Sequence, residues 1–435
     1  MPRWRWLLIQ ITRRLWFRAT LIGLAGVIVA ASGIVFQRYI PWDIPGTIAS
    51  SAENDILNII ASSMLTVTTF SLSVMITAYD SSTNDASPRA TRLLIEDSTT
   101  QNVLSTFIGS FLFSIVGLIL LKTGLYGEHG RVILFAVTIA IIILIVVMLL
   151  RWIDHLTRLG RVGATTARVE QVARRAIQER LDNPWLGGVP FDGSDIPFGF
   201  VAIPSGDVGY VQHIDMDRLS ECTEEGLYSV YVSALPGTMT FPDTPLAWVS
   251  PSSDVEKTNA LIENFRKAFS VGNERDFDQD PRFGVTVLAE IGLRALSSAI
   301  NDPGTVLDVL GRETRLMALW STAQMERAGY KPSYPHVHVP GLQDMDLFDD
   351  AFTLICRDSA QLIEMQLRIQ KSLRALAGMG SEKFRAAARF YADTALQRAH
   401  ESLSSPIDKA RLQELVDKEE QQHPFPLQAS KAFSA

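Results

Sequence analysis

The sequence has very few cysteines: Cys222 and Cys356 are the only two among 435 residues. Neither belongs to a Cys-x-x-Cys pair, and no cysteine lies near histidines at the spacing of a zinc site. A disulfide-stabilised scaffold and a cysteine-ligated metal centre are therefore excluded. We expect both thiols to be reduced and structural, and we expect no metal site.

The sequence also lacks any tract rich in lysine and arginine, and its formal net charge is −7. Proteins that follow nucleic-acid phosphates carry such tracts, so nucleic acid is not an expected partner. Common catalytic signatures are missing as well: there is no Gly-x-Ser-x-Gly, no phosphate-binding Gly-x-x-x-x-Gly-Lys and no His-Glu-x-x-His. We therefore expect no enzyme activity, no catalytic residue and no cofactor.

Four stretches contain no charged residue, although 20% of the whole chain is charged. Each is about as long as the roughly 20 residues that a helix needs to cross the hydrocarbon core of a bilayer. The predicted spans are 19–37, 56–79, 98–121 and 132–150. Residues 1–155 are thus predicted to form a four-helix transmembrane domain, with the lipid bilayer as its first partner.

Arginine residues flank these spans unevenly, which predicts the orientation of the chain. The segments before the first span and after the fourth contain nine arginines between them: Arg3, Arg5, Arg13, Arg14, Arg18, Arg151, Arg158, Arg161 and Arg168. In the two connections that would face outward, the lysine and arginine residues are Arg38, Lys122 and Arg131. Positive residues concentrate on the cytoplasmic side of membrane proteins, so we expect both termini in the cytoplasm.

Small residues repeat on one face of the first span and on one face of the third. They are Gly26, Ala30 and Gly33 in the first span, and Ser110, Ser114 and Gly117 in the third. Small side chains let membrane helices approach closely. This pattern predicts a tight bundle and favours a homo-oligomer.

The second span has polar side chains at intervals of three or four residues, which places them on one helical face. They are Asn58, Ser62, Thr66, Thr69, Ser73 and Thr77. One interpretation is a face that packs against other helices, because serine and threonine are common packing residues in membranes. The other interpretation is a face that lines a polar pathway.

The chain after residue 155 has the pattern of a cytoplasmic α+β domain. We predict that the fourth span continues as a stalk helix (156–183), followed by a small mixed β unit (184–252) and a mainly helical domain (253–404). Two long helices are expected in that domain, at 348–377 and 382–403. Residues 405–435 are polar, and we expect a flexible tail there.

One helix of the helical domain combines an apolar sequence with charged residues. Asp280-Pro281 is a strong helix start, and the helix ends before Asn301-Asp302-Pro303. Arg282, Glu290, Arg294, Asn301 and Asp302 are candidates for a buried polar network, with Glu290 and Arg294 spaced for an ion pair. Alternatively, Arg282 or Arg294 binds an anion near a helix N-terminus.

Several of these segments together resemble a known family. They are the run from Phe70-Ser-Leu-Ser to Ser87-Pro-Arg89, then Glu96-Asp97, Asp280-Pro-Arg-Phe-Gly284, Arg294-Ala-Leu-Ser and Asn301-Asp-Pro303. The sequence is similar to the predicted membrane proteins called domain of unknown function 2254, over most of its length. The resemblance implies a bacterial multi-pass membrane protein, hence the inner membrane. It implies no activity and no catalytic residues.

These observations leave three functional hypotheses, of which a membrane enzyme ranks last because no paired catalytic residues are found. The first is an oligomeric channel or transport protein whose second span lines the pathway and whose cytoplasmic domain is the gate. The alternative is a membrane-anchored sensor or scaffold without catalysis, which binds an unidentified cytoplasmic ligand or protein. We favour the first because the polar face of the second span is the only feature inside the membrane that needs an explanation.

Overall fold

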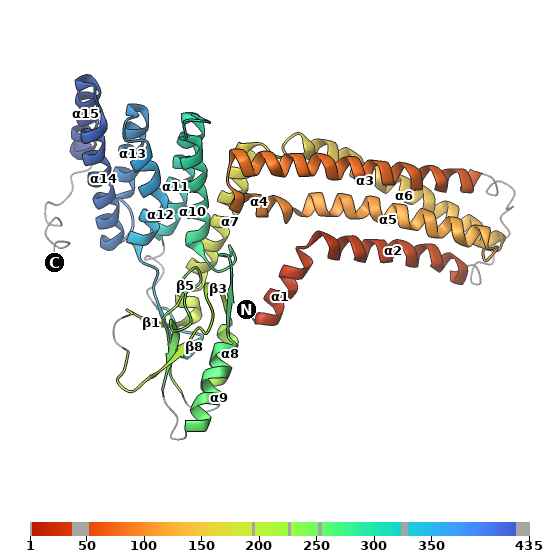
Figure 1. The fold of residues 1–435 in the computed structure, drawn as a ribbon, viewed down its shortest axis with the longest axis horizontal. Coiled ribbons are helices and arrows are strands. Elements are labelled where there is room, and N and C mark those ends of the chain that lie inside the picture. The colour runs from red at the N-terminus through yellow and green to blue at the C-terminus, as the bar shows by residue number, and fades with distance from the viewer. Residues whose placement is uncertain are drawn as a thin grey trace. The chain divides into compact units, whose positions relative to one another are not determined.

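The computed structural model describes residues 2–36, 52–193, 196–224, 228–250, 255–322 and 329–422 (Figure 1). The chain divides into two compact units. The membrane unit comprises Leu7–Asn84 and Pro88–Thr165. The C-terminal unit comprises Met1–Trp6, Asp85–Ser87 and Thr166–Ala435. The chain therefore passes between the units four times, after residues 6, 84, 87 and 165.

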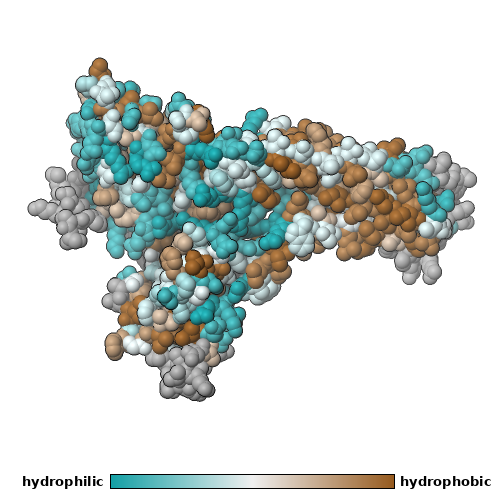
Figure 2. Space-filling model, in the orientation of Figure 1, coloured by the Kyte–Doolittle hydropathy of each residue, from teal (hydrophilic) through white to brown (hydrophobic). Residues whose placement is uncertain are grey.

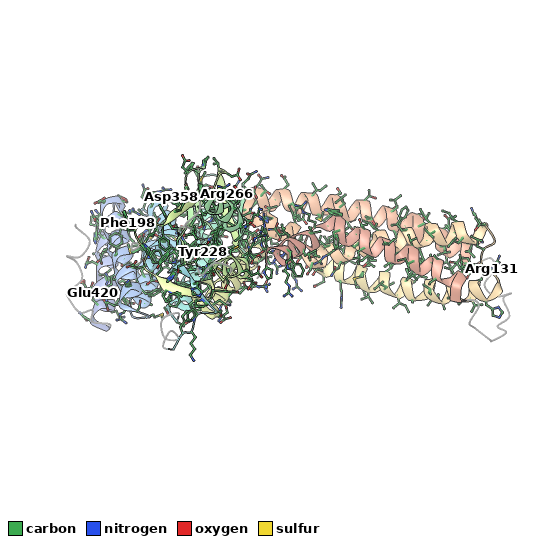
Figure 3. The ribbon with its side chains drawn as sticks, turned by 90° about the horizontal axis from the view of Figure 1, so that it is seen from below. Arg131, Phe198, Tyr228, Arg266, Asp358 and Glu420 are labelled. Atoms are coloured by element: carbon green, nitrogen blue, oxygen red, sulfur yellow. The ribbon has the colours of Figure 1, made fainter. Side chains whose placement is uncertain are left out.

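Four helices of the membrane unit are long and apolar enough to cross a bilayer. They are α2 (Leu15–Phe36), α3 (Ala52–Asp85), α5 (Ser98–Lys122) and α6 (Glu128–Leu156). The prediction of four transmembrane helices is confirmed. Figure 2 shows hydrophobic side chains gathered over these helices. Arg131 lies near the start of α6, at the end of the unit (Figure 3).

Two short helices complete the first part of the chain. They are α1 (Arg3–Thr12), before α2, and α4 (Pro88–Ile95), before α5. A side-chain cap defines the start of α5, because the Asp97 carboxylate accepts a hydrogen bond from the Thr100 amide at 2.9 Å.

Small residues let α2 and α5 pack closely within one copy of the chain. A Cβ added to Gly26 would lie 2.7 Å from the carbonyl oxygen of Gly109, so no side chain fits there. A Cβ on Gly33 would lie 3.0 Å from the ring of Tyr126, whose hydroxyl donates a hydrogen bond to the Ala30 carbonyl. The small-residue face of the first span is thus covered inside the unit and requires no second copy.

The helix expected to continue from the fourth span is interrupted by a turn. α6 ends at Leu156, and α7 (Val162–Asp182) begins after Gly160. Gly160 has a φ of +80°, which a residue with a Cβ adopts only under strain. The prediction of a continuous helix is wrong at this glycine, because hydrophobic periodicity carries no information about the sign of φ.

The C-terminal unit contains two small sheets. One has five strands in the order β1-β8-β4-β6-β2, and the other has three in the order β5-β3-β7. β1 and β4 run parallel to β8, and the remaining pairs are antiparallel. The strands are β1 (Gly188–Phe191), β2 (Val201–Pro204), β3 (Gly209–Ile214), β4 (Val230–Val232), β5 (Met239–Thr240), β6 (Pro245–Val249), β7 (Phe269–Gly272) and β8 (Tyr334–Pro340).

Both sheets draw strands from beyond residue 252. β7 completes the smaller sheet and β8 occupies a central position in the larger one, although both lie in the segment predicted to be mainly helical. Two helices, α8 (Met216–Glu224) and α9 (Val255–Arg266), share the apolar core of these strands. A 3-10 turn, Pro184–Gly187, leads from α7 into β1. The β segment is therefore part of one folded unit with the helices that follow it.

Six helices form the rest of the C-terminal unit among its described residues. They are α10 (Pro281–Ala295), α11 (Pro303–Ser321), α12 (Asp344–Asp358), α13 (Ile363–Leu376), α14 (Glu382–Ser402) and α15 (Pro406–Gln422). Aromatic rings link two of them, α12 and α14: Phe348 of α12 stacks near Phe352 and contacts Phe384 and Tyr391 of α14. Their burial gives this region its hydrophobic stabilisation.

Two predictions about these helices require correction. The helix expected at 348–377 is two helices, because Gln366 donates a hydrogen bond to the Ser359 carbonyl at 2.9 Å and so stabilises a turn between them. The segment expected to be a flexible tail from residue 405 contains α15, whose Leu412 and Val416 are buried. Residues 423–435 lie outside the described residues.

Candidate functional site

The polar face of α3 points away from the other helices of its own unit. All six of its side chains are exposed: Asn58, Ser62, Thr66, Thr69, Ser73 and Thr77. The side chains that α3 buries, such as Leu57, Met64 and Met75, lie on the opposite side of the helix. Packing inside the unit therefore uses the apolar face of α3 and leaves the polar face for a neighbour outside it.

The hydroxyl groups of this face donate hydrogen bonds within their own helix. Ser62 donates to the Asn58 carbonyl at 3.0 Å, and Thr66 donates to the Ser62 carbonyl at the same distance. Thr69 and Thr77 make the same contact one turn back, at 2.6 and 3.1 Å. The hydroxyl hydrogens of these four residues are thus satisfied without water, while their oxygens can still accept another hydrogen bond. The face is polar, uncharged and stable in a membrane.

The second candidate site begins at the N-terminus of α10. The Asp280 carboxylate caps this helix by accepting hydrogen bonds from the amides of Arg282 and Phe283, at 3.1 and 3.2 Å. The guanidinium of Arg275 donates to the same carboxylate at 2.8 Å. Asp280 is 1% exposed, so this cap and ion pair are inside the protein.

Arg282 connects α10 to α12. Its guanidinium donates to Asp350 at 2.6 Å and to Asp346 at 2.8 Å. Burial works to lower the pKa of Arg282, but the hydrogen bond and charge of Asp350 outweigh burial and raise it. Two carboxylates are bound to Arg282, and Asp280 occupies the N-terminus of α10. Acidic side chains therefore lie at the place where the alternative hypothesis put a bound anion.

The other residues of the predicted network lie farther along α10. Glu290 accepts a hydrogen bond from the Ser87 hydroxyl at 2.9 Å, and Glu290 and Arg294 are both half-buried. Asn301 and Asp302 are exposed beyond the C-terminus of α10. Asn301 has a φ of +47°, and Asp302 caps α11 by accepting from Thr305. From Arg282 to Ala295, whose carbonyl accepts a hydrogen bond from the Asp302 amide, α10 rises about 20 Å, so the five residues do not form one site.

Among the buried titratable groups that the sequence analysis did not identify, Glu313 and His213 are fully buried. Glu313 of α11 is fully buried, and neither of its carboxylate oxygens has a hydrogen-bond partner among the described residues. Burial raises the pKa of Glu313 well above its usual range, and the nearby carboxylates of Asp350 and Glu170 add to this. The spacing of Glu313 from Val309, Leu310 and Leu316 places it on the apolar face of α11, which is the signal that could have revealed it.

His213 of β3 is the second buried group. It is fully buried, and its ring stacks on Trp6 with the ring centroids 5.2 Å apart. The indole N–H of Trp6 donates to Asp278 at 3.2 Å, and the Arg3 amide donates to Asp215. Burial lowers the pKa of His213 to about 4, although Asp215 and Asp278 oppose this. The beginning of the chain therefore covers a neutral histidine.

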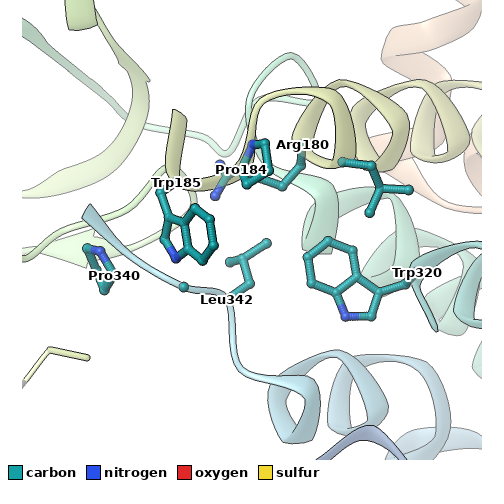
Figure 4. Close-up of a pocket in the computed structure, with 8 residues that line it drawn as sticks. Arg180, Pro184, Trp185, Trp320, Pro340 and Leu342 are labelled. Carbon is teal, nitrogen blue, oxygen red and sulfur yellow. The ribbon is translucent and has the colours of Figure 1, made fainter. Parts of the chain in front are cut away.

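A small pocket lies between the end of α7, the end of α11 and the segment that follows β8 (Figure 4). Arg180, Trp185, Trp320 and Leu342 are among the side chains around it, and its volume is about 20 Å³. Such a space holds about one water molecule, so it is not a substrate site. In the parts of the chain that the structure describes, no three His, Cys, Asp or Glu side chains converge to hold a metal ion.

Comparison with known proteins agrees with the membrane helices. A family of predicted membrane proteins, DUF2254, matches residues 12–375. Uncharacterized proteins of Mycobacterium bovis and Mycobacterium tuberculosis are each 24% identical over 279 residues, which cover 59% of this chain and 50% of the relative. The chain thus spans about half the length of the curated relatives it matches. No solved structure matches.

The family match includes all four candidate membrane spans and continues through α12 to the end of α13. It therefore covers both the polar face of α3 and the buried charges around α10. The chain belongs to the DUF2254 family of predicted membrane proteins.

Proposed function

We propose that the chain is a homo-oligomeric channel or transport protein of the bacterial inner membrane. In this proposal, α3 lines a polar pathway where copies meet, and the C-terminal unit is a cytoplasmic gate. The observation that carries the proposal is that the polar face of α3 points out of its own unit. A second copy of the same face is a neighbour of matching chemistry, since its hydroxyl oxygens can share water or a solute.

The length of the polar face supports a pathway. From Asn58 to Thr77 the helix rises about 28 Å, which is close to the roughly 30 Å thickness of the hydrocarbon core. A local packing motif needs only one or two turns, whereas a pathway needs polar groups across the entire core. The absence of charge among the six side chains favours a route for water, ions that keep their hydration, or small neutral solutes.

Flux through the purified full-length protein in liposomes tests this function. We expect Thr69→Leu to reduce flux, because a leucine in mid-membrane would interrupt the polar lining. The matched control is Thr20→Leu on α2, where an exposed threonine makes the same hydrogen bond, to the Trp16 carbonyl at 2.8 Å. Equal flux in wild type and Thr69→Leu would rule out α3 as the lining.

The contact between copies has a separate test. Thr69→Cys, in a chain whose Cys222 and Cys356 are replaced by alanine, should form disulfide-linked dimers on oxidation in membranes. The control is a cysteine at Ile139 of α6, which is also exposed in the membrane unit. Cross-linking at Ile139 but not at Thr69 would place the contact on another face.

The alternative function, a sensor or scaffold, is favoured by an exposed apolar patch in the C-terminal unit. Val208 and Phe241 are each 56% exposed and Met239 is 45% exposed, next to the short edge strand β5. Exposed apolar side chains beside a sheet edge are typical of protein-binding surfaces. Absence of flux, combined with a specific protein partner that Phe241→Ser releases, would favour this function over conduction.

A further inference from the structure

A groove lies along the last turns of α3 inside the membrane unit, beside the turn that follows α6. Its volume is about 460 Å³, which is within the range of about 300 to 1,000 Å³ for small-molecule sites, and it is open on one side. α3 contributes Val74, Thr77 and Ser81, and the turn contributes Leu159 and Arg161.

Gly160 shapes this groove. Its φ of +80° turns the chain toward α3, and a Cβ on it would lie 3.2 Å from three atoms of Ala78, two of them backbone. The turn therefore sits against α3 at a distance that only glycine permits. This fixed turn places Arg161 beside the hydroxyl groups of α3.

The groove lies where the apolar part of the membrane unit ends. The uncharged run of α3 stops at Tyr79, before Asp80, and that of α6 stops at Leu150, before Arg151. α3 has 34 residues and is about 51 Å long, so its last turns extend past a hydrocarbon core of roughly 30 Å. In a bilayer, lipid phosphate groups lie at this depth.

The lining combines two kinds of chemistry. Val74, Ala78 and Leu159 are apolar, whereas Thr77 and Ser81 carry hydroxyls and Arg161 carries a guanidinium, which binds phosphate oxygens in a forked geometry. No carboxylate is among the lining residues that the structure describes. A free phosphate would use only the polar part of this surface, whereas a phospholipid also offers an acyl chain for the apolar part.

We propose that this groove binds an anionic phospholipid, with its phosphate on the guanidinium of Arg161 and the upper part of an acyl chain along Val74 and Leu159. Basic pockets between membrane helices are a common form of lipid head-group site. The groove shares Ser73 and Thr77 with the proposed pathway, but lipid binding needs only one copy of the chain, so it stands even if α3 lines no pathway. Its consequence is that lipid composition acts on the turn that connects the membrane unit to α7.

The test uses full-length protein in phosphatidylcholine nanodiscs that contain a small fraction of spin-labelled lipid. The fraction of immobilised label is measured by electron paramagnetic resonance, for phosphatidylglycerol and for phosphatidylcholine. We expect more immobilised phosphatidylglycerol in wild type, and a ratio of the two lipids that falls toward one in Arg161→Gln. The matched control is Arg158→Gln, which removes the same charge three residues earlier from an exposed guanidinium that pairs with Asp154 at 3.0 Å.

A second variant separates the site from general surface charge. Val74→Phe leaves all charges in place but fills the apolar part of the groove, so it should also lower the ratio. An unchanged ratio in Val74→Phe, equal effects of Arg161→Gln and Arg158→Gln, or no preference in wild type would each overturn the proposal. Release of the labelled lipid by inorganic phosphate alone would show an anion site and overturn the lipid assignment.

Discussion

The exposed face of α3 and the buried charges around α10 satisfy their polar groups in opposite ways. In the membrane unit, the hydroxyls of α3 donate to carbonyls of the same helix, and the polar face is left outside. In the C-terminal unit, charged groups lie inside and bond between elements, as Arg282 does with two carboxylates of α12. The first arrangement tolerates a surrounding without water, whereas the second fixes how helices pack.

This contrast teaches where each unit is sensitive to mutation. Loss of a self-bonded hydroxyl removes a group that no other element needs. Loss of one member of a buried ion pair leaves an uncompensated charge in the interior, which costs several kcal/mol. Glu313 and His213 are a third kind of group, buried without a hydrogen-bond partner among the described residues, and burial disfavours the charged form of each.

The largest expected effect comes from Asp280→Ala. The change removes the cap of α10 and leaves the guanidinium of Arg275 without the carboxylate it contacts at 2.8 Å. We expect the free energy of unfolding of the C-terminal unit to fall by about 3 to 5 kcal/mol. Urea unfolding of the full-length protein in detergent, followed by tryptophan fluorescence, measures this loss.

The control for that change is Asp358→Ala, which removes an acidic partner from the exposed Arg357. An exposed pair contributes little, so no change in unfolding is expected. Similar losses in both variants would mean that burial does not decide the importance of these ion pairs, and the contrast between the units would fail.

A smaller effect is expected from the titration of His213. Its pKa is about 4 in the folded protein and about 6.5 in the unfolded chain, so the unfolded state binds more protons between these values. Its contribution is complete above about pH 6.5 and is lost as the pH falls toward 4, by up to about 3 kcal/mol. His213→Phe keeps an aromatic ring against Trp6 and should remove this part of the pH dependence.

The measurement compares unfolding curves of wild type and His213→Phe across this pH range, so that other titrating groups cancel. The free energy of unfolding of wild type should fall relative to that of His213→Phe as the pH falls from about 6.5 toward 4. Parallel pH profiles would show that the stacked histidine of the C-terminal unit remains neutral for another reason, or that the start of the chain does not cover it in solution.

The smallest effect is expected from Thr66→Val in the membrane unit. Valine keeps the shape of threonine but removes the hydrogen bond to the Ser62 carbonyl. Because this bond is local and exposed, we expect a change in unfolding free energy of no more than about 0.6 kcal/mol. Unfolding in mixed micelles of increasing denaturing detergent measures it, and a loss comparable to that of Asp280→Ala would contradict the comparison.

The sequence contained most of the information about the spans and about the start of α10. Uncharged runs of sufficient length identify membrane helices with little dependence on tertiary contacts, and Asp280-Pro281 is a local signal for a helix start. The order of the strands could not be read in this way. β8 lies between β1 and β4 although it follows them by about 100 residues or more, and hydrogen bonds at that separation leave no local pattern.

The candidate sites were partly accessible from the sequence. The spacing of Thr66, Thr69 and Ser73 predicts a shared face, but only tertiary packing decides whether that face is turned inward or outward. The partners of Arg282 lie on α12, more than 60 residues later, so no local pattern predicts them. Helical spacing predicts only pairs such as Glu290 with Arg294, four residues apart. The groove beside Gly160 depends on one backbone angle and had no sequence signal.

The number of residues between Thr77 and Asp85 sets the angle between the polar face of α3 and the last turn of the same helix. Ala86 and Ser87 are buried in the C-terminal unit, where Ser87 bonds to Glu290, and α3 is one continuous helix up to Asp85. Each residue of a helix turns by about 100°. Inserting or deleting one residue between Thr77 and Asp85 would therefore rotate the polar face by about 100° relative to the last turn of α3. The number of residues in this helix therefore determines the direction in which the polar face points as well as the length of the helix.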